Sequence, residues 1–414
     1  MQFTMGSMTT RSLPTIQWDT PSSLDAEMKP FDDMENPLTI EDQYLALLAE
    51  VIDLGTHKGD RTGTGTRSLF GRQLRHRMSD GFPLLTTKHV SLRNVATELI
   101  WFLRGRTDLR WLLVRNCHIW VGDAYKKYRQ YAGSLEEPDY SVHVDDPKES
   151  SIRLMTQQEF IDEILQNDWF SGRFGDLGPV YGKQWRSWQV ELEHSDGVTY
   201  YKHPPIDQVE NLIRDLKENP DSRRMMVNAW NVAEIDQMTL PPCHYGFQVW
   251  TRELSLDERL DHWFKHSKPN RDVVDEVDAM SDDEKLRYLS HVPTRAVSLM
   301  WNQRSVDIPL GLPYNIASYA LLLVLIAREV GMIPDELVCS LGDCHVYQDQ
   351  VETAREQIMR EPYPFPIVAF DERYIYPCGE WQLSFSEKID QLEPDWFTAV
   401  DYQHHPRLNY PLSN

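Results

Sequence analysis

Cysteine is scarce in this sequence of 414 residues, and its five copies are scattered. Their number is odd and no Cys-x-x-Cys pair occurs, which argues against a disulfide framework of the secreted type. A structural zinc site needs clustered Cys and His ligands, so we expect no metal. A reducing cytoplasm fits this usage best. The five positions are Cys117, Cys243, Cys339, Cys344 and Cys378.

Long apolar runs are also missing. The N-terminal residues contain no apolar stretch of the signal-peptide type. The longest run, near 320–327, is too short to span a bilayer and is typical of a buried helix. The sequence therefore predicts no membrane segment.

Positive charge is in short supply. Lys and Arg number 42 against 64 Asp and Glu, which gives a formal net charge of -22. A broadly negative surface repels nucleic acid and anionic membranes, so no nucleic-acid partner is expected. An anionic substrate would need a local cluster of Arg. The simpler interpretation is that the acidity mainly keeps the protein soluble.

The hydrophobic pattern predicts an α+β domain without regular βαβ alternation. Residues 1–37 are rich in Ser, Thr, Pro, Asp and Met, and we expect a flexible extension before one domain at 38–414. Two polar, acidic segments, about 132–170 and 254–296, are predicted to be insertions. Helices are predicted from Thr39 up to the stop at Gly55, at 92–103, from Ile206 to Leu216 and at 316–330, and strands in the second half of 60–75 and at 225–230, 246–251 and 297–304.

Cys243 stands in the run Pro241-Pro242-Cys243-His244. A lone Cys is most often a small buried hydrophobe. Here the prolines stiffen the approach and His244 is adjacent, which favours the alternative of a reactive thiol. A nucleophilic thiol needs a nearby cation to favour the thiolate. Arg304 is a candidate, although the sequence alone does not place it near Cys243.

Several arginines lie in loops rich in Gly, Ser and Thr. Arg61 is in a Gly/Thr loop, Arg223 and Arg224 follow a Pro-Asp-Ser turn, and Arg304 is in a Gln-Arg-Ser run. Each alone is more often a solvated surface residue. In an acidic protein their shared setting favours phosphate binding, because the guanidinium fork donates paired hydrogen bonds. The Gly-Thr-Gly-Thr run is not a P-loop, since no GxxxxGK[ST] occurs.

Further polar positions have two interpretations each. Glu98 lies on the apolar helix at 92–103, where a carboxylate is either paired with a cation or tuned as an acid–base group. Asn315 precedes the buried helix and is either an N-cap or an amide that reads a base edge. His345 and Tyr347 alternate onto one face of a strand, which suits the hydroxyl groups of a sugar.

Together these segments resemble the thymidylate synthase family, which includes the phage deoxypyrimidine hydroxymethylases. The matching strings run in family order from about residue 38 to the C-terminus, and the two insertions lie outside them. The resemblance implies a large mixed β-sheet packed with helices, and a homodimer with active sites shared between subunits. The strings are Asp60-Arg-Thr-Gly-Thr-Gly-Thr66, Thr97-Glu-Leu-Ile-Trp-Phe-Leu103, Leu177-Gly-Pro-Val-Tyr-Gly-Lys-Gln-Trp185, Pro220-Asp-Ser-Arg-Arg224, Pro242-Cys-His244, Gln303-Arg-Ser305, Gly311-Leu-Pro-Tyr-Asn-Ile-Ala-Ser-Tyr319 and Gly342-Asp-Cys-His-Val-Tyr347.

The resemblance implies a site for deoxyuridylate (dUMP). Cys243 would add to C6 of the pyrimidine, and Arg304 would bind the phosphate and favour the thiolate. Asn315 would hydrogen-bond O4 and N3 of uracil, whereas the cytosine-specific phage branch has Asp there. The remaining nucleotide contacts would come from Arg61, Ser305, Asp307, His345 and Tyr347, and from Arg223 and Arg224 of the partner subunit.

The resemblance also implies 5,10-methylenetetrahydrofolate as co-substrate. Glu98 would organise proton transfers through water, and Tyr181 would help remove the C5 proton. Lys88, Trp120 and Asp307 would face the folate.

On the folate side the sequence departs from synthases. After Trp120 it continues Val121-Gly122-Asp123, where synthases usually have Asp and, two residues on, Trp or Asn. Ser91 stands where bacterial synthases commonly carry His, and it is expected to face the folate.

The C-terminal tail is the third departure. Residues 409–414, which include Ser413, lack the small apolar ending that closes over folate in synthases. With the other two changes this predicts that Asp123 orients a water onto the reacting carbon. The product would then be 5-hydroxymethyl-dUMP, formed in the host cytoplasm if the chain is phage-encoded. The alternatives are a thymidylate synthase, in which hydride replaces water, and an inactive nucleotide-binding protein that keeps the fold.

Overall fold

The computed structural model describes residues 38–59, 63–133, 141–143, 152–189, 192–195, 198–201, 204–371 and 383–412. The chain divides into a unit at Met1–Leu38 and a unit at Thr39–Asn414, and the fold described below is that of the second. The predicted extension at 1–37, Arg61 and Ser413 lie outside the described residues.

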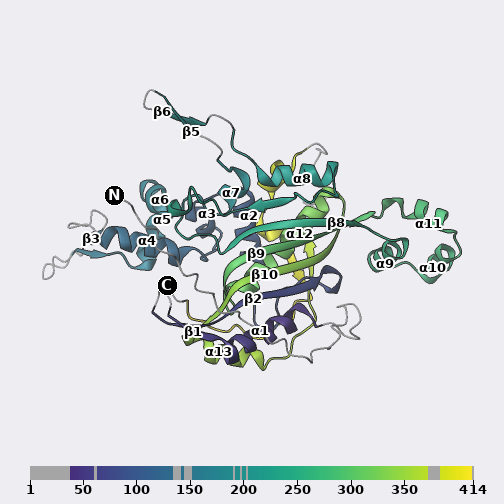
Figure 1. Ribbon diagram of the computed structural model, residues 1–414, viewed down its shortest axis with the longest axis horizontal. Helices are drawn as coiled ribbons and strands as arrows, with labels where there is room; N and C mark the ends of the chain where they lie inside the picture. The colour runs from purple at the N-terminus through teal and green to yellow at the C-terminus, as the bar shows by residue number, and fades with distance from the viewer. Residues whose placement is uncertain are drawn as a thin grey trace, which may run out of the picture. The chain divides into compact units, whose positions relative to one another are not determined.

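A six-stranded mixed sheet forms the centre of the domain (Figure 1). Its strand order is β1-β2-β10-β9-β8-β7, and β9 and β10 run parallel while the other neighbours are antiparallel. The predicted α+β class with a large mixed sheet is thus confirmed. The strands are β1 Thr56–Lys58, β2 Thr66–Arg77, β7 Met226–Asn228, β8 His244–Glu253, β9 Arg295–Asp307 and β10 Ile333–Tyr347.

Apolar helices pack against the sheet and supply most of the core. The central one is α12 Gly311–Val330, which contacts β9, β10, α2 Leu92–Leu103 and α8 Gln208–Glu218. It is long and apolar enough to cross a membrane, but 72% of its most apolar window is buried inside the protein, as in a core helix. α1 Ile40–Leu54 begins with a capping box between Thr39 and Asp42.

The remaining elements surround this core. The helices are α3 Leu109–Leu113, α4 Val121–Gly133, α5 Gln157–Gln166, α6 Asp168–Phe174, α7 Gly182–Arg186, α9 Leu256–Ser267, α10 Arg271–Asp278, α11 Asp282–Tyr288, α13 Val351–Ile358 and α15 Phe385–Gln391. Two-stranded sheets are β3 Ser141–His143 with β4 Ile152–Leu154, β5 Leu192–Ser195 with β6 Val198–Tyr201, and β11 Ile367–Phe370 with β12 Phe397–Val400. Short 3-10 turns occupy Met78–Asp80, Ile235–Gln237, Leu289–His291, Gln348–Gln350 and Pro394–Trp396.

The two predicted insertions differ in how they pack. Between β8 and β9, the helices α9, α10 and α11 enclose a small core of their own, made by Trp263, Val277, Leu289 and Val292. In 132–170, by contrast, Phe160, Ile164 and Phe170 belong to the main core. The second half of that segment is therefore an integral part of the domain.

The face of the sheet opposite α12 carries apolar side chains that remain accessible. Strand pairing aligns Met226, Gln248, Met300 and Val338 across four strands, so their side chains share one face. Met226 is 57% exposed and Trp250, two residues beyond Gln248, is 56% exposed. Exposed apolar side chains gathered on one sheet face are typical of an interaction surface.

Candidate active site

Strand pairing brings Arg304 against the loop that carries Cys243. Cys243 lies just before β8, and its carbonyl accepts the Arg304 amide at 2.8 Å. The Arg304 guanidinium donates to the carbonyls of Pro242 at 2.9 Å and Pro241 at 3.0 Å. The β8–β9 register shifts between His244 and Gly246, an irregularity typical of strands next to active sites. The cation that the thiol requires is therefore held beside the thiol loop.

His244 does not supply that cation. It is buried, and loss of hydration lowers the pKa of its imidazole to about 3, so the ring is neutral at physiological pH. Its Nδ1 lies 2.8 Å from the Tyr319 hydroxyl, and its ring packs 4.3 Å from that of Tyr181. His244 is thus a packing residue, and the cation held beside the thiol loop is Arg304.

Tyr181 contacts the thiol loop directly. Its hydroxyl accepts the Cys243 amide at 2.7 Å, and its ring lies 5.9 Å from Trp120. Burial, followed by the proximity of Cys243, raises the pKa of the Tyr181 phenol well above its usual value. The phenol is therefore a neutral O–H group, which can relay a proton but does not ionise near neutral pH.

Glu98 is a buried carboxyl that contacts Trp120 of this cluster. It lies on α2 among buried neighbours, and burial raises the pKa of its carboxyl to about 7, while a hydrogen bond from Trp120 Nε1, 2.9 Å from Oε1, opposes the rise. In the described residues no cation lies within ion-pair distance of Glu98. Of the two interpretations from sequence, the tuned carboxyl is favoured over a buried ion pair.

Asn315 is not an N-cap. The capping position of α12 is Leu310, and Asn315 lies inside the helix. Its Nδ2 donates to Gln303 Oε1 at 3.1 Å, and Gln303 also accepts from Trp301 Nε1 at 3.3 Å. Gln303 was given no role from sequence, although it begins the matching string Gln303-Arg-Ser305. The pair leaves the amide of Asn315 fixed near the C-terminal end of β9, the strand that carries Arg304.

His345 and Tyr347 lie on one face of β10 as predicted, with ring centroids 5.3 Å apart. Parallel pairing sets His345 beside Asp307 and Asp343 beside Ser305. Ser305, Asp307, His345 and Tyr347 are therefore neighbours on two adjacent strands.

Asp307 connects this strand pair to the C-terminal tail. Its carboxylate accepts from the Leu310 amide at 3.0 Å and from Gln350 Nε2 at 3.2 Å. The same Gln350 nitrogen donates to the carbonyl of Pro411 at 3.1 Å. Burial, the largest cause, raises the pKa of Asp307 despite these bonds. Gln350 was not found from sequence because its two partners, Asp307 and Pro411, come near it only when the chain is folded.

Lys88 is buried on the same side. Its ammonium donates to the Pro309 carbonyl and lies 5.1 Å from the Tyr410 ring. Burial lowers the pKa of Lys88 to about 8, and the charge of Asp307 opposes that shift. Lys88, Asp307 and the tail residues Tyr410 and Pro411 thus form one group, next to the predicted folate side.

Ser91 and Asp123 lie at the N-terminal ends of two helices. The Ser91 hydroxyl caps α2 by accepting the Asn94 amide at 3.3 Å. Asp123 is in the first turn of α4, three residues after Trp120. One turn further, Lys127 donates to Thr239 Oγ1 at 3.2 Å, and Thr239 lies four residues before Cys243. This side of α4 therefore faces the thiol loop.

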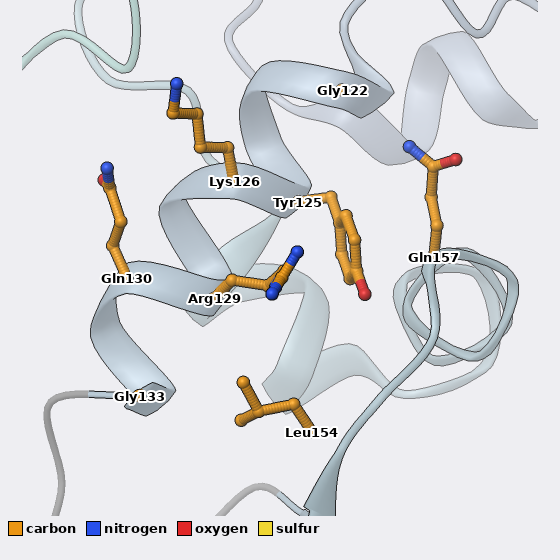
Figure 2. Close-up of a pocket in the computed structure, with 8 residues that line it drawn as sticks. All are labelled: Gly122, Tyr125, Lys126, Arg129, Gln130, Gly133, Leu154 and Gln157. Atoms are coloured by element: carbon orange, nitrogen blue, oxygen red, sulfur yellow. The ribbon is translucent and has the colours of Figure 1, made fainter. Parts of the chain in front are cut away.

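A cavity of about 640 Å³ borders α4 as well (Figure 2). Gly122, Tyr125, Lys126, Arg129, Gln130, Gly133, Leu154 and Gln157 line it. Another cavity, of about 470 Å³, lies over β7–β9 on the accessible sheet face, where Arg304 and Trp230 are 5.3 Å apart. The cavity over β7–β9 adjoins the thiol loop, whereas the cavity beside α4 is lined by none of the predicted site residues.

Arg223 and Arg224 are not brought to Cys243. They are exposed just before β7, where the Val249 amide donates to Met225 at 3.1 Å and Met226 pairs with Gln248. Arg224 is therefore level with Trp250, about six residues along β8 from His244, or roughly 20 Å at the rise of a strand. Among the residues that the structure describes, no group of three or more His, Cys, Asp or Glu is arranged to hold a metal.

Comparison with known proteins agrees with the resemblance found in the sequence. A family model described as "Thymidylate synthase" matches residues 42–414. A curated relative, the thymidylate synthase of Listeria innocua, is 37% identical over 357 residues, which cover 85% of this chain and 96% of the relative.

Proposed function

Because the chain belongs to the thymidylate synthase family, a family of folate-dependent one-carbon transferases, we propose that it adds the one-carbon unit of 5,10-methylenetetrahydrofolate to C5 of dUMP and that water completes the reaction. The product is then 5-hydroxymethyl-dUMP, with release of tetrahydrofolate. The observation that carries the covalent part is the Arg304 guanidinium bonded to the two prolines before Cys243.

The proposed nucleotide site uses residues at the C-terminal ends of β9 and β10. Arg304, with Ser305 and Arg61, binds the 5′-phosphate, and His345 and Tyr347 bind the sugar hydroxyl. Asn315, held by Gln303 at 3.1 Å, bonds to the uracil edge. An amide offers both a donor and an acceptor, which matches N3–H and O4 of uracil.

Cys243 starts the reaction. Its Sγ forms a bond to C6 of the ring, and the displaced electron pair makes C5 the nucleophile. The folate supplies the carbon that C5 attacks. C5 then loses its proton through water held by Glu98 and the Tyr181 hydroxyl, and departure of tetrahydrofolate leaves an exocyclic methylene on the base. A carboxyl with a pKa of about 7 suits this step, since it gives and takes protons equally at neutral pH.

The residues present fit a reduced folate in chemical terms. The Trp120 ring offers an aromatic face, Asp307 offers a carboxylate to ring N–H groups, and Lys88 offers a cation to the anionic end. The docked tail residues Tyr410 and Pro411 close the same side.

The choice of water is supported by Asp123. It lies on the side of α4 that carries Lys127 and faces the thiol loop, where synthases have a larger polar or aromatic side chain. A carboxylate there can orient water onto the methylene carbon. The added water loses a proton, and the electron pair that returns to C5 expels the Cys243 thiolate from C6 and restores the C5–C6 double bond. The second candidate is thymidylate synthase itself, in which tetrahydrofolate gives hydride and becomes dihydrofolate. It is favoured by the name of the relative that is 37% identical.

We further propose an obligatory homodimer with shared sites in the cytoplasm. Arg223 and Arg224 lie roughly 20 Å along β8 from the thiol loop of their own subunit, so they serve the site of the partner. The accessible sheet face, with Met226 and Trp250 more than half exposed, is the surface through which the two subunits would pair.

The deciding experiment is to incubate the protein with dUMP and methylenetetrahydrofolate and to weigh the nucleotide. Addition of one hydroxymethyl group supports the proposal. Thymidylate with stoichiometric dihydrofolate would replace it by the synthase. Tight dUMP binding without turnover would point to an inactive nucleotide-binding protein.

A further inference from the structure

Arg295 connects the base of the inserted helices to the turn that precedes Arg223 and Arg224. Its guanidinium forms an ion pair with Asp221 and donates to Thr251 Oγ1 at 3.0 Å. The side chain of Arg295 is only 16% exposed, whereas that of Asp221 is 77% exposed. Arg295 is thus the fixed partner, and the turn is held against it.

Thr251 completes the connection. Its hydroxyl donates to the carbonyl of Pro220 at 2.7 Å while it accepts from Arg295. Within the turn the Ser222 amide donates to Asn219 at 3.0 Å. The backbone of the turn is therefore tied to the end of β8, and its acidic side chain to the start of β9.

We propose that Arg295 is a positioning residue that orients the turn at 219–222, so that Arg223 and Arg224 reach the phosphate in the partner subunit's site. This rests on the proposed function, because it takes those two arginines as phosphate ligands in trans. Asp221 lies two residues before Arg223. Without the Asp221–Arg295 ion pair, the turn would lose its side-chain anchor and the two arginines their fixed orientation.

The inference gives the segment between β8 and β9 a role. Its base is closed by the Leu254 amide, which donates to Thr294 at 2.9 Å, and Arg295 follows directly. A second arginine, Arg252, anchors the same base elsewhere, with Glu258 of α9 at 2.7 Å and Asp335 of β10 at 2.8 Å. Arg252 does not contact the turn in the described contacts, so it is a matched control.

The first test compares Arg295→Met with Arg252→Met in the full-length protein. We expect Arg295→Met to raise the KM for dUMP about fivefold, with kcat at saturating dUMP within about twofold of the parent. Inorganic phosphate, used as a competitive probe, should show a Ki raised to the same extent, and the KM for methylenetetrahydrofolate should not change. Arg252→Met should leave all four constants unchanged. If Arg295→Met folds poorly, Asp221→Asn removes the same ion pair from the exposed side.

The second test asks in which subunit Arg295 acts. Cys243→Ala protein is mixed with Arg295→Met protein under conditions that exchange subunits. In the mixed dimer, the Arg295→Met subunit supplies the intact thiol, and the Cys243→Ala subunit supplies Arg223 and Arg224 together with a native Arg295. The KM of this site for dUMP should therefore return to the parental value. A KM that stays raised would overturn the inference, because Arg295 would then act within its own subunit.

Failure of the inference is distinguishable from failure of the proposed function. If Arg223→Ala with Arg224→Ala does not weaken dUMP or phosphate binding, the phosphate site in trans is wrong. If that double variant weakens both but Arg295→Met and Asp221→Asn do not, only the role of Arg295 is wrong.

Discussion

The indole Nε1 of Trp120 donates a hydrogen bond of 2.9 Å to Oε1 of Glu98. This bond stabilises the ionised carboxyl, while burial favours the neutral form more strongly, and the pKa of Glu98 settles at about 7. One aromatic side chain therefore adjusts the proton affinity of this buried carboxyl. Trp120 thus lowers the pKa of Glu98, in addition to any contact that it makes with folate.

Removing that bond should move the pH dependence of catalysis. Trp120→Phe keeps an aromatic ring but loses the donor, so the pKa of Glu98 should rise by about one pH unit. The transition in kcat/KM near pH 7 should shift upward by the same amount, as measured across pH 5 to 9. Glu98→Gln, which does not titrate, should abolish the transition. An unmoved transition in Trp120→Phe would show that this bond does not govern the titration.

Glu98 should also make folding stability depend on pH. A carboxyl with a higher pKa in the folded than in the unfolded chain binds its proton more tightly when folded. Its stabilising effect is complete below about pH 4.5 and is lost as pH rises to about 7. The loss approaches about 3 kcal/mol. Urea unfolding at pH 5 and pH 8 should show this difference in the parent and a smaller one in Glu98→Gln. Equal pH dependence in both would contradict it.

Elements with a strong apolar period could be predicted closely from the sequence. The helix at Leu92–Leu103 has the predicted bounds, because its apolar stripe is wide and Ser91 caps it. Ile206 was wrongly assigned to the helix of Leu216. It continues the helical spacing by chance, but Asp207 is the N-cap, and Ile206 instead pairs with Trp188. A period alone does not show where the backbone leaves the helix.

The sequence identified most residues of the candidate site, but it did not show which of them contact one another. That Arg304 meets the Cys243 loop depends on the pairing of β8 with β9, which joins residues 62 apart in sequence. No local pattern encodes this register. Gln303 and Gln350 were missed for the same reason, since each bonds to groups that only the sheet and the tail bring near. His244 was overvalued because adjacency in sequence does not reveal burial.

Mixed dimers should reveal whether sites are shared. Cys243→Ala and the double variant Arg223→Ala with Arg224→Ala should each be nearly inactive. After subunit exchange, half of the dimers are mixed, and each has one native thiol opposite native arginines, so about a quarter of parental activity should return. Activity that stays near zero would mean that the arginines act in their own subunit.

Asp123 should control the product if it orients water. Asp123→Asn keeps the size of the side chain but removes the charge, and Asp123→Trp fills the space. Both should lower the share of 5-hydroxymethyl-dUMP relative to thymidylate, as measured by mass spectrometry of the nucleotide. Arg129→Met, which lines the cavity and lies about a third of a turn around the same helix from Asp123, is the control and should leave the ratio unchanged. A ratio unaffected by either Asp123 change would remove this residue from the choice between water and hydride.

The thiol of Cys243 should be singled out by alkylation. Cys117, Cys339 and Cys344 are buried, and burial raises the pKa of each, to about 12 for Cys117 and Cys344, so they remain thiols. Cys243 is partly exposed beside the Arg304 cation, and the thiolate is the form that reacts. Iodoacetamide at pH 7.5 should therefore modify Cys243 ahead of these three, as read by peptide mapping. Arg304→Met should slow that reaction about tenfold by removing the cation, whereas Arg252→Met should not. Added dUMP should protect Cys243 from alkylation only where the nucleotide site is intact. Equal alkylation rates in the parent and in Arg304→Met would show that Arg304 does not activate the thiol.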